Sequence, residues 1–304
     1  MSDRLYGRSC QLIITSPDGV GRTYSGITPP ALARVEERDG QIQIINPEEA
    51  KDCFRIAFNV ELTSESNSNL ATVSIYNLND TSRAFIEKDG IKVILMAGFG
   101  PNPQIIFAGE VDGDKTKSEK NGADIITTIE SGEGKFSLNN TVLNKTFAPG
   151  VSIEQAIKDV GKDLGLPINA KDIKSEKFNQ GLSISGSPQE VLNNLTKKQD
   201  LEWSVQAGIL EIKKKNGTIS DEAVVMGPET GLVSILKKLS DGLEFVSLLN
   251  SLLRPGRPVK IESKFLKGDN FFIVRKVQHQ GDNFSGPWNS FVECAAPKEF
   301  KTFT

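Results

Sequence analysis

The chain has 304 residues, which is long enough for two ordinary domains with a sizeable buried core. Hydrophobic residues make up 38% and charged residues 25% of the sequence, as in ordinary soluble proteins, and the net charge is −3. This balance gives no sign of the basic surface of a nucleic-acid binder, so we expect no specific nucleic-acid binding. We also expect no signal peptide and no membrane insertion, because the longest apolar stretch, 243–253, is too short to span a bilayer.

The first half of the chain predicts a succession of strands. Apolar and polar residues alternate strictly at 54–62, the period of a half-buried strand. Four more strands are expected between turns rich in Gly, Pro, Asn and Asp, at 71–78, 91–98, 104–111 and 123–131. Short strands at this spacing favour a sandwich or a barrel. Residues 18–49 are rich in Gly, Pro and charge, and predict a long loop with one weak strand near 42–45.

A short helix is expected between the second and third of these strands. Asp80 or Thr81 can cap its N-terminus, and Gly90 can end it. Nothing in this strand-turn-helix stretch, 71–90, has the character of a catalytic site. The stretch predicts scaffolding.

The middle of the chain changes to helical spacing and predicts a small α+β unit at 150–215. Its first helix begins with a capping box at Ser152 and Gln155 and is closed by Gly165 and Pro167. The second helix is expected to start with Ser187 as N-cap, followed by Pro188 at the first helical position.

The second helix needs an apolar face, and Val191, Leu192 and Leu195 supply it. After it, residues 201–215 predict a β-hairpin with its turn at Ala207 and Gly208.

The last third returns to strands. They are expected at 223–227, 231–238, 258–263, 270–279 and 290–295, with a short buried helix at 243–253 that ends at Pro255 and Gly256. We find no repeat of fixed period. The predicted fold is therefore mainly β with an α+β insert: a first β-barrel-like domain at 1–137, an α+β insert domain at 138–215 and a second β-barrel-like domain at 216–304.

The sequence nominates no catalytic, cofactor-binding or metal-binding residue. His279 is the only histidine, no Ser or Cys motif points to it, and we expect it at a strand end with a structural hydrogen bond. The three cysteines, Cys10, Cys53 and Cys294, lack metal-ligand or disulfide spacing and predict buried reduced thiols in a reducing cytosol.

Three other stretches resemble parts of functional sites, but each predicts a structural role instead. The acidic stretch 109–115 lacks the spacing of a calcium loop and predicts a solvated hairpin turn. The glycine-rich stretch 97–103 leads into a strand, whereas a phosphate cradle needs a helix N-terminus. The lysine run at 213–215 is expected to protect an exposed edge strand. We therefore expect a protein that is not an enzyme.

Taken in order, several short pieces resemble the baseplate hub proteins of contractile-tailed bacteriophages and related contractile injection systems. They cover about 54 to 296 and are VSIYNL, ILMAGF, IIFAGEV, the capped helix, LEWSVQAGILEI, TGLVSI, LLNSLLRPGRPVKIES and VQHQGDNFSGPWNSFVECA. The most telling are Asn250 with Pro255, Gly256 and Ser263, and HQGDN followed by Trp288. Two parts depart from the family pattern: residues 234–236, where Gly and Pro are expected after TGL, and the 18–49 loop.

The resemblance implies a structural role in the phage virion. Such a hub is a homotrimer that joins the six-fold tail tube above to the three-fold central spike below, and it lines part of the channel for DNA and the tape measure protein. Further partners would be tape measure and baseplate wedge proteins, with synthesis in the cytoplasm of the bacterial host. Binding would come from extended surfaces with a few aromatic anchors, for which the candidates are Phe99, Phe107, Trp203 and Trp288.

Two other functional classes stay open at this point. One is a tail-associated cell-wall hydrolase, which could hide its two carboxylates among the 39 acidic residues. The other is a β-rich adaptor protein of the host cytoplasm. Clearing of peptidoglycan by the purified chain would favour the first, and copurification with tube and spike proteins would favour the hub.

Overall fold

The computed structural model describes residues 7–27, 35–38, 41–44, 53–64, 69–88, 90–134, 138, 141–171, 173, 176–197, 199–215, 217–264, 266 and 270–297. In the first half the elements are β1 (Arg8–Thr15), β2 (Gly21–Ile27), β3 (Val35–Arg38), β4 (Gln41–Ile44), β5 (Ile56–Thr63), β6 (Leu70–Tyr76), α2 (Asp80–Ile86), β7 (Lys92–Phe99), β8 (Gln104–Val111), η3 (Gly113–Lys115), β9 (Lys117–Asn121) and β10 (Asp124–Gly132). The five strands predicted for this half are confirmed.

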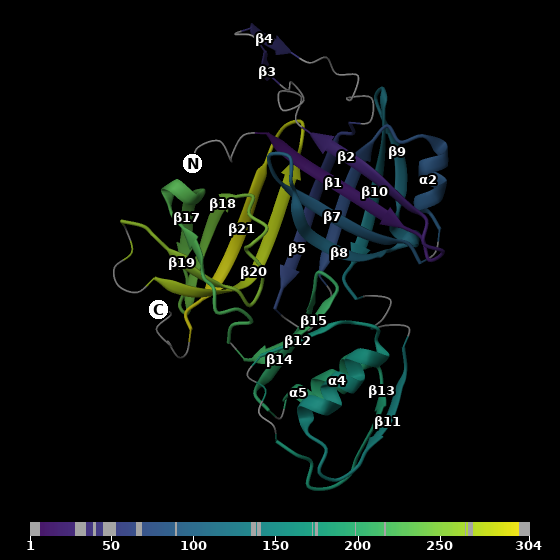
Figure 1. Cartoon of the computed structure of the whole chain (residues 1–304), viewed down its shortest axis with the longest axis vertical. Helices are drawn as coiled ribbons and strands as arrows, with labels where there is room; N and C mark the ends of the chain where they lie inside the picture. Colours follow the sequence, from purple (N-terminus) through teal and green to yellow (C-terminus); the bar gives the residue numbers. More distant parts are fainter. Residues whose placement is uncertain are drawn as a thin grey trace.

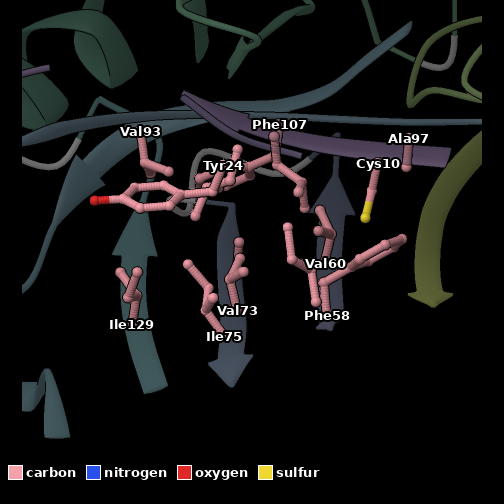
Figure 2. Close-up of a cluster of buried hydrophobic side chains, with 14 of the residues drawn as sticks. Cys10, Tyr24, Phe58, Val60, Val73, Ile75, Val93, Ala97, Phe107 and Ile129 are labelled. Carbon is pink, nitrogen blue, oxygen red and sulfur yellow. The ribbon is translucent and has the colours of Figure 1, made fainter. Parts of the chain in front are cut away.

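The strands of the first half curl into a barrel (Figure 1). Their order is β5-β6-β10-β8-β7-β1-β2, and β9 pairs with β10 outside this path. The barrel closes where β2, at one end of this order, meets the residues just before β5 at the other end. Ser25 of β2 bridges to Cys53, and its carbonyl accepts a hydrogen bond from the Phe54 N–H at 2.9 Å. We call this unit the N-terminal barrel. Side chains from every wall of it meet in one core, as Figure 2 shows for Tyr24, Phe58 and Phe107.

The prediction of a long loop at 18–49 is wrong for much of its length. β2 lies in this range and pairs along its whole length with β1, a strand that the sequence did not predict. β3 and β4 form a separate hairpin; β4 confirms the weak strand near 42–45, although Ile45 lies outside the described residues. β2 escaped prediction because Gly, Arg, Thr and Ser occupy most of its positions, and only Tyr24 is a large apolar residue in its middle.

Helix α2 is present, but its predicted cap is wrong. Asn79 is the N-cap: its backbone is extended and its side-chain Oδ1 accepts a hydrogen bond from the Ser82 N–H at 2.8 Å. The helix ends at Glu87, so Gly90 is not its stop. Gly90 adopts a left-handed conformation, with φ of 72°, in the turn that follows and packs closely against Pro17.

The middle of the chain folds as the predicted α+β unit, which we call the insert (Figure 1). Its elements are β11 (Leu143–Phe147), α4 (Ile153–Asp163), β12 (Ile168–Ala170), β13 (Leu182–Gly186), α5 (Pro188–Lys197), β14 (Leu201–Gln206) and β15 (Ile209–Lys214). A three-stranded sheet has the order β12-β15-β14, and β11 pairs with β13.

The local signals for the insert are confirmed. Ser152 caps α4 by accepting from the Gln155 N–H at 3.2 Å. Ser187 and Glu190 cap α5 reciprocally, each side chain accepting from the other residue's N–H. The hairpin turns at Ala207 and Gly208, whose φ angles of 51° and 77° are those of a tight two-residue turn.

The last third contains β16 (Val224–Met226), η4 (Pro228–Thr230), β17 (Leu232–Lys238), β18 (Gly242–Leu248), β19 (Pro258–Ile261), β20 (Phe271–Asp282) and β21 (Trp288–Ala295). All five predicted strands are present. The predicted helix at 243–253 is wrong, because β18 pairs with β17 on one side and β21 on the other. A short apolar run fits a buried strand as well as a buried helix, and here the ladders on both sides decide.

The described residues have three hydrophobic cores. One fills the N-terminal barrel, one lies within the insert from Leu138 to Ile212, and one lies among β16–β21. The predicted domain borders, at 137/138 and 215/216, lie close to the positions along the chain where one core ends and the next begins. The division into three domains stays a prediction. No helix in the described residues is long and apolar enough to cross a membrane.

The buried face of α5 gives a direct test of the insert core. Leu195 is 4% exposed and packs in that core, so Leu195→Ala should lower the free energy of unfolding by about 2–5 kcal/mol through the lost methyl groups and the remaining cavity. Urea denaturation followed by circular dichroism measures this loss. The matched control is Val142→Ala, because Val142 is 74% exposed; its effect should stay within about 0.5 kcal/mol. Equal effects of the two substitutions would contradict the placement of α5.

Candidate functional site

The only histidine has a structural place. His279 is fully buried inside β20, not at the strand end that we expected, and its Nδ1 lies 2.8 Å from the Ser290 hydroxyl on β21. Burial, reinforced by the charge of Arg254, lowers the pKa of His279 to about 3, so the ring is neutral at ordinary pH. The structural hydrogen bond is confirmed.

The other groups weighed in the sequence also have structural places. Cys10 and Cys294 are buried, and burial raises the pKa of both thiols far above their ordinary value, whereas Cys53 is half-buried. The acidic stretch runs from the end of β8 into η3, where the Lys115 ammonium lies 3.5 Å from Asp112. β8 and β9 both pair with β10 and not with each other, so the predicted hairpin turn is wrong. No group of three or more His, Cys, Asp or Glu side chains in the described part of the chain could hold a metal ion.

The lysine run at 213–215 does not protect an edge, because β15 is the central strand of its sheet. Lys213 is buried and forms an ion pair with Glu202 on the neighbouring strand β14. Its methylene groups pack against Gly256, which belongs to the last third of the chain. Lys213 therefore joins two parts of the molecule, and the prediction of an edge strand is wrong.

The aromatic residues proposed as binding anchors lie mainly inside the molecule. Phe107, Trp203 and Trp288 are each at most 3% exposed, and Phe99 is half-buried against the barrel core. Trp203 donates its indole N–H to the Asn193 side chain within the insert. The three buried residues hold the chain together and are not exposed to a partner.

The structure brings residues that are distant in sequence together at two places, which we call joints. The first, which we call the seam, is an antiparallel ladder in which residues 276–282 of β20 pair with residues 57–63 of β5. The start of β20 pairs instead with β19, and the change of partner coincides with a β-bulge between Val274 and Lys276. A bulge bends a strand and increases its twist, so β20 can pair with β19 at its start and with β5 further along.

Polar side chains fasten one end of the seam. The Arg55 guanidinium donates to the Asp282 carboxylate, with the Nη2–Oδ2 distance 2.7 Å. Burial alone would raise the pKa of Asp282, but the hydrogen bonds from Arg55 and from the loop N–H groups of Phe284 and Ser285 lower it. Asn283 continues the ladder with its side chain, accepting from the Ile56 N–H at 2.7 Å and donating to the Phe54 carbonyl at 3.0 Å.

An aromatic residue of the last third completes the barrel core at the seam. Trp288 of β21 is 2% exposed, lies edge-on to Phe58 with ring centroids 5.3 Å apart, and donates its indole N–H to the Gly98 carbonyl at 3.2 Å. Gly281 leaves the room for this contact. The stretch HQGDN therefore lies at the seam, with residues 279–282 at the end of β20 and Asn283 directly after it, and Trp288 begins the neighbouring strand β21.

The second joint, which we call the insert joint, is a buried polar cluster. Asn69 precedes β6, Glu133 follows β10, Gln206 ends β14, and Ala207 begins the hairpin turn of the insert. The Asn69 amide donates to Glu133 at 2.7 Å and to the Val205 carbonyl at 2.9 Å. Gln206 donates to the Thr63 carbonyl at 2.7 Å, and the Ala207 N–H donates to Glu133 at 2.9 Å. These bonds fix the insert to one rim of the N-terminal barrel.

No sequence signal pointed to the insert joint. Glu133 ends a strand pattern in an ordinary run of polar residues, and its partners lie far away in the sequence. The carboxyl group is completely buried, and this burial raises its pKa to about 7. The hydrogen bonds from Asn69, Ala108 and Ala207, together with the charge of Arg254, act in the opposite direction.

Two solved structures that are similar to this chain over most of its length are phage tail proteins. The 43 kDa tail protein of prophage MuSo2 from Shewanella oneidensis aligns with a TM-score of 0.58 and 10% identity over 95% of this chain and 98% of its own. A tail protein from Neisseria meningitidis MC58 aligns with a TM-score of 0.60 and 10% identity over 96% and 97%. The chain has the phage tail-protein fold.

A third structure extends the tail-protein fold to secretion systems. It is a component of the Escherichia coli type VI secretion system, described as structurally similar to the T4 bacteriophage tail proteins gp27 and gp5. It aligns with a TM-score of 0.56 and 12% identity over 82% of this chain and 74% of its own. No protein-family model and no curated protein matches the sequence. The resemblance to tail hubs is thus confirmed at the level of the fold, as is the expectation of a mainly β chain with an α+β insert.

Because the side chains at the seam pack closely around Gly281, we expect a single added methyl group at this position to destabilise the protein. A Cβ on Gly281 would lie 2.2 Å from the Phe58 ring and 2.8 Å from the Trp288 ring, so Gly281→Ala should lower the free energy of unfolding by about 1–3 kcal/mol. Gly113→Ala is the control, since no atom lies within 4 Å of its added Cβ. Urea titrations of both variants measure the difference. A Gly281→Ala protein as stable as the control would show that Trp288 does not pack on Phe58.

Proposed function

We propose that this protein is a structural component of a phage tail, and specifically a hub that joins the tail tube to the central spike. The observation that carries the proposal is the fold, which aligns over nearly the full length of two phage tail proteins. In this role the protein is part of the virion after synthesis in the host cytoplasm, and it has no catalytic activity of its own.

The two ends of the N-terminal barrel fit a position between two different neighbours. The β3–β4 hairpin is inserted between β2 and Cys53, next to the start of β5. The insert is fastened at the other end of the same strand, where Gln206 donates to the Thr63 carbonyl. Figure 1 shows the hairpin and the insert at opposite ends of the molecule. A component that lies between a tube and a spike needs a different binding surface at each end, and the hairpin and the insert differ in this way.

The two β-rich parts of the chain also fit a change of symmetry. The N-terminal barrel and the β16–β21 unit are joined side by side by the seam, so one chain offers two β-rich units at a fixed angle. Three chains in a closed ring would then present six such units to a six-fold tube and a three-fold surface to a spike. A closed ring needs head-to-tail contacts, in which each chain uses two different faces.

The lumen of such a ring would form part of the channel for DNA and the tape measure protein, and baseplate wedge proteins would surround it. A net charge of −3 is compatible with a wall that does not bind passing phosphates. This part of the proposal follows from the position in the tail.

A cryo-EM reconstruction of the assembled tail tests the proposal. We expect three copies of the chain in one ring, with the tube protein at one end of the barrel and the spike protein at the other. Six copies, or a position away from the tube–spike junction, would contradict it. Clearing of peptidoglycan by the purified chain would contradict the non-catalytic role and favour a cell-wall hydrolase. Absence of the chain from purified particles would favour a host adaptor.

A further inference from the structure

The insert joint holds the end of the seam that lies away from Asp282. The last pair of the ladder at this end joins Thr63 of β5 to Lys276 of β20. The Thr63 N–H donates to the Asn69 side chain at 2.7 Å, and the Thr63 carbonyl accepts from the Gln206 amide at 2.7 Å. Both backbone groups of this seam residue are therefore bonded within the insert joint.

Side chains continue the hydrogen bonding of β5 beyond its pairing with β6. The last pair between these two strands joins Glu61 to Leu70, and Thr63 lies past it. Asn69 and Gln206, which bond to Thr63, are 2% and 3% exposed, and the Asn69 amide donates to the Gln206 side chain at 3.1 Å. Because this group is buried, breaking its bonds leaves polar atoms that bulk water does not reach while the joint is closed.

The insert also contacts the β20 side of the seam. Lys213 of β15 is 4% exposed, is held by its ion pair with Glu202, and packs its methylene groups against Gly256. The Gly256 N–H donates to the Val274 carbonyl at 2.8 Å. Val274 lies directly before the bulge that separates it from Lys276, the first residue of the seam on β20. The contact with Gly256 therefore reaches the strand that faces Thr63.

Gln206 and Lys213 belong to one hairpin, because β14 and β15 pair along their whole length. A single ladder thus makes both contacts and spans the end of the seam. From this geometry we propose that the insert is a clamp on the seam, which holds β5 and β20 together at the Thr63 end, opposite the end that Asp282 and Asn283 fasten. This inference does not depend on the proposed function.

A clamp links the insert joint to the seam energetically. At this end β5 and β20 separate only when the hairpin releases Thr63 or Gly256, so the closed joint stabilises the seam. The coupling free energy is reciprocal, and a weakened seam therefore loosens the insert as well. A protein that draws the insert away from the barrel would weaken the contact between the two β-rich units, and one that presses the insert into place would strengthen it.

Hydrogen–deuterium exchange measured by mass spectrometry on the full chain tests the clamp. In Gln206→Ala the Thr63 carbonyl loses the bond from the Gln206 amide. We therefore expect the peptides that cover 61–64 and 275–278 to lose roughly tenfold in protection. The other end of the ladder, at 279–282, and strand β7 should keep their wild-type protection, because a local clamp acts only on the end that it holds.

Gln155→Ala is the matched control. Gln155 lies on α4 in the same insert, and its amide donates to Asp159 of its own helix at 3.0 Å. The substitution removes the same chemical group from the insert, but from an exposed helix position outside the insert joint. Protection of the seam should equal that of the wild type.

Three results would overturn the proposal. They are wild-type protection at 275–278 in Gln206→Ala, a loss that is equally large at 279–282 and in β7, or the same loss at the seam in Gln155→Ala. Gln206→Met is measured alongside, since it keeps the length of the side chain but not its amide. It should reproduce the loss, and it decides by the same criteria if Gln206→Ala does not fold.

Discussion

Residues 276–282 of β20 pair with residues 57–63 of β5, and this ladder determines how the two ends of the chain are placed. Through it the N-terminal barrel and the β16–β21 unit share one 14-stranded sheet, and Trp288 of the last third completes the core of the first. The β-bulge between Val274 and Lys276 lies where β20 changes its pairing partner from β19 to β5.

Polar side chains that are buried or half-buried make both joints specific. Apolar contacts alone tolerate small shifts, whereas the Arg55–Asp282 pair and the Asn69–Glu133 cluster satisfy their hydrogen bonds in one arrangement. Leaving any of these groups buried without its partner costs more than the bond contributes, so misaligned joints are penalised.

The local sequence pattern predicts much of the fold. Apolar and polar residues alternate with period two in the half-buried strands, and the insert helices carry their own caps, as at Ser187 and Glu190. It failed where tertiary pairing overrides local preference. The apolar run of β18 fits a helix as well as a strand, and β2 has little apolar character. Both joints unite side chains from distant parts of the chain, as Glu133 and the insert turn do, so no window of sequence contains them. The stretch around Asp282 was singled out only through resemblance.

Native-state hydrogen exchange in increasing denaturant measures the central constraint most directly, since it reports the opening free energy of each strand separately. If the seam unites the two β-rich units, amides of β5, β20 and β21 should open together in one cooperative step with the same dependence on denaturant. A β16–β21 unit that opens at clearly lower denaturant, while β5 keeps its full protection along 57–63, would contradict the account.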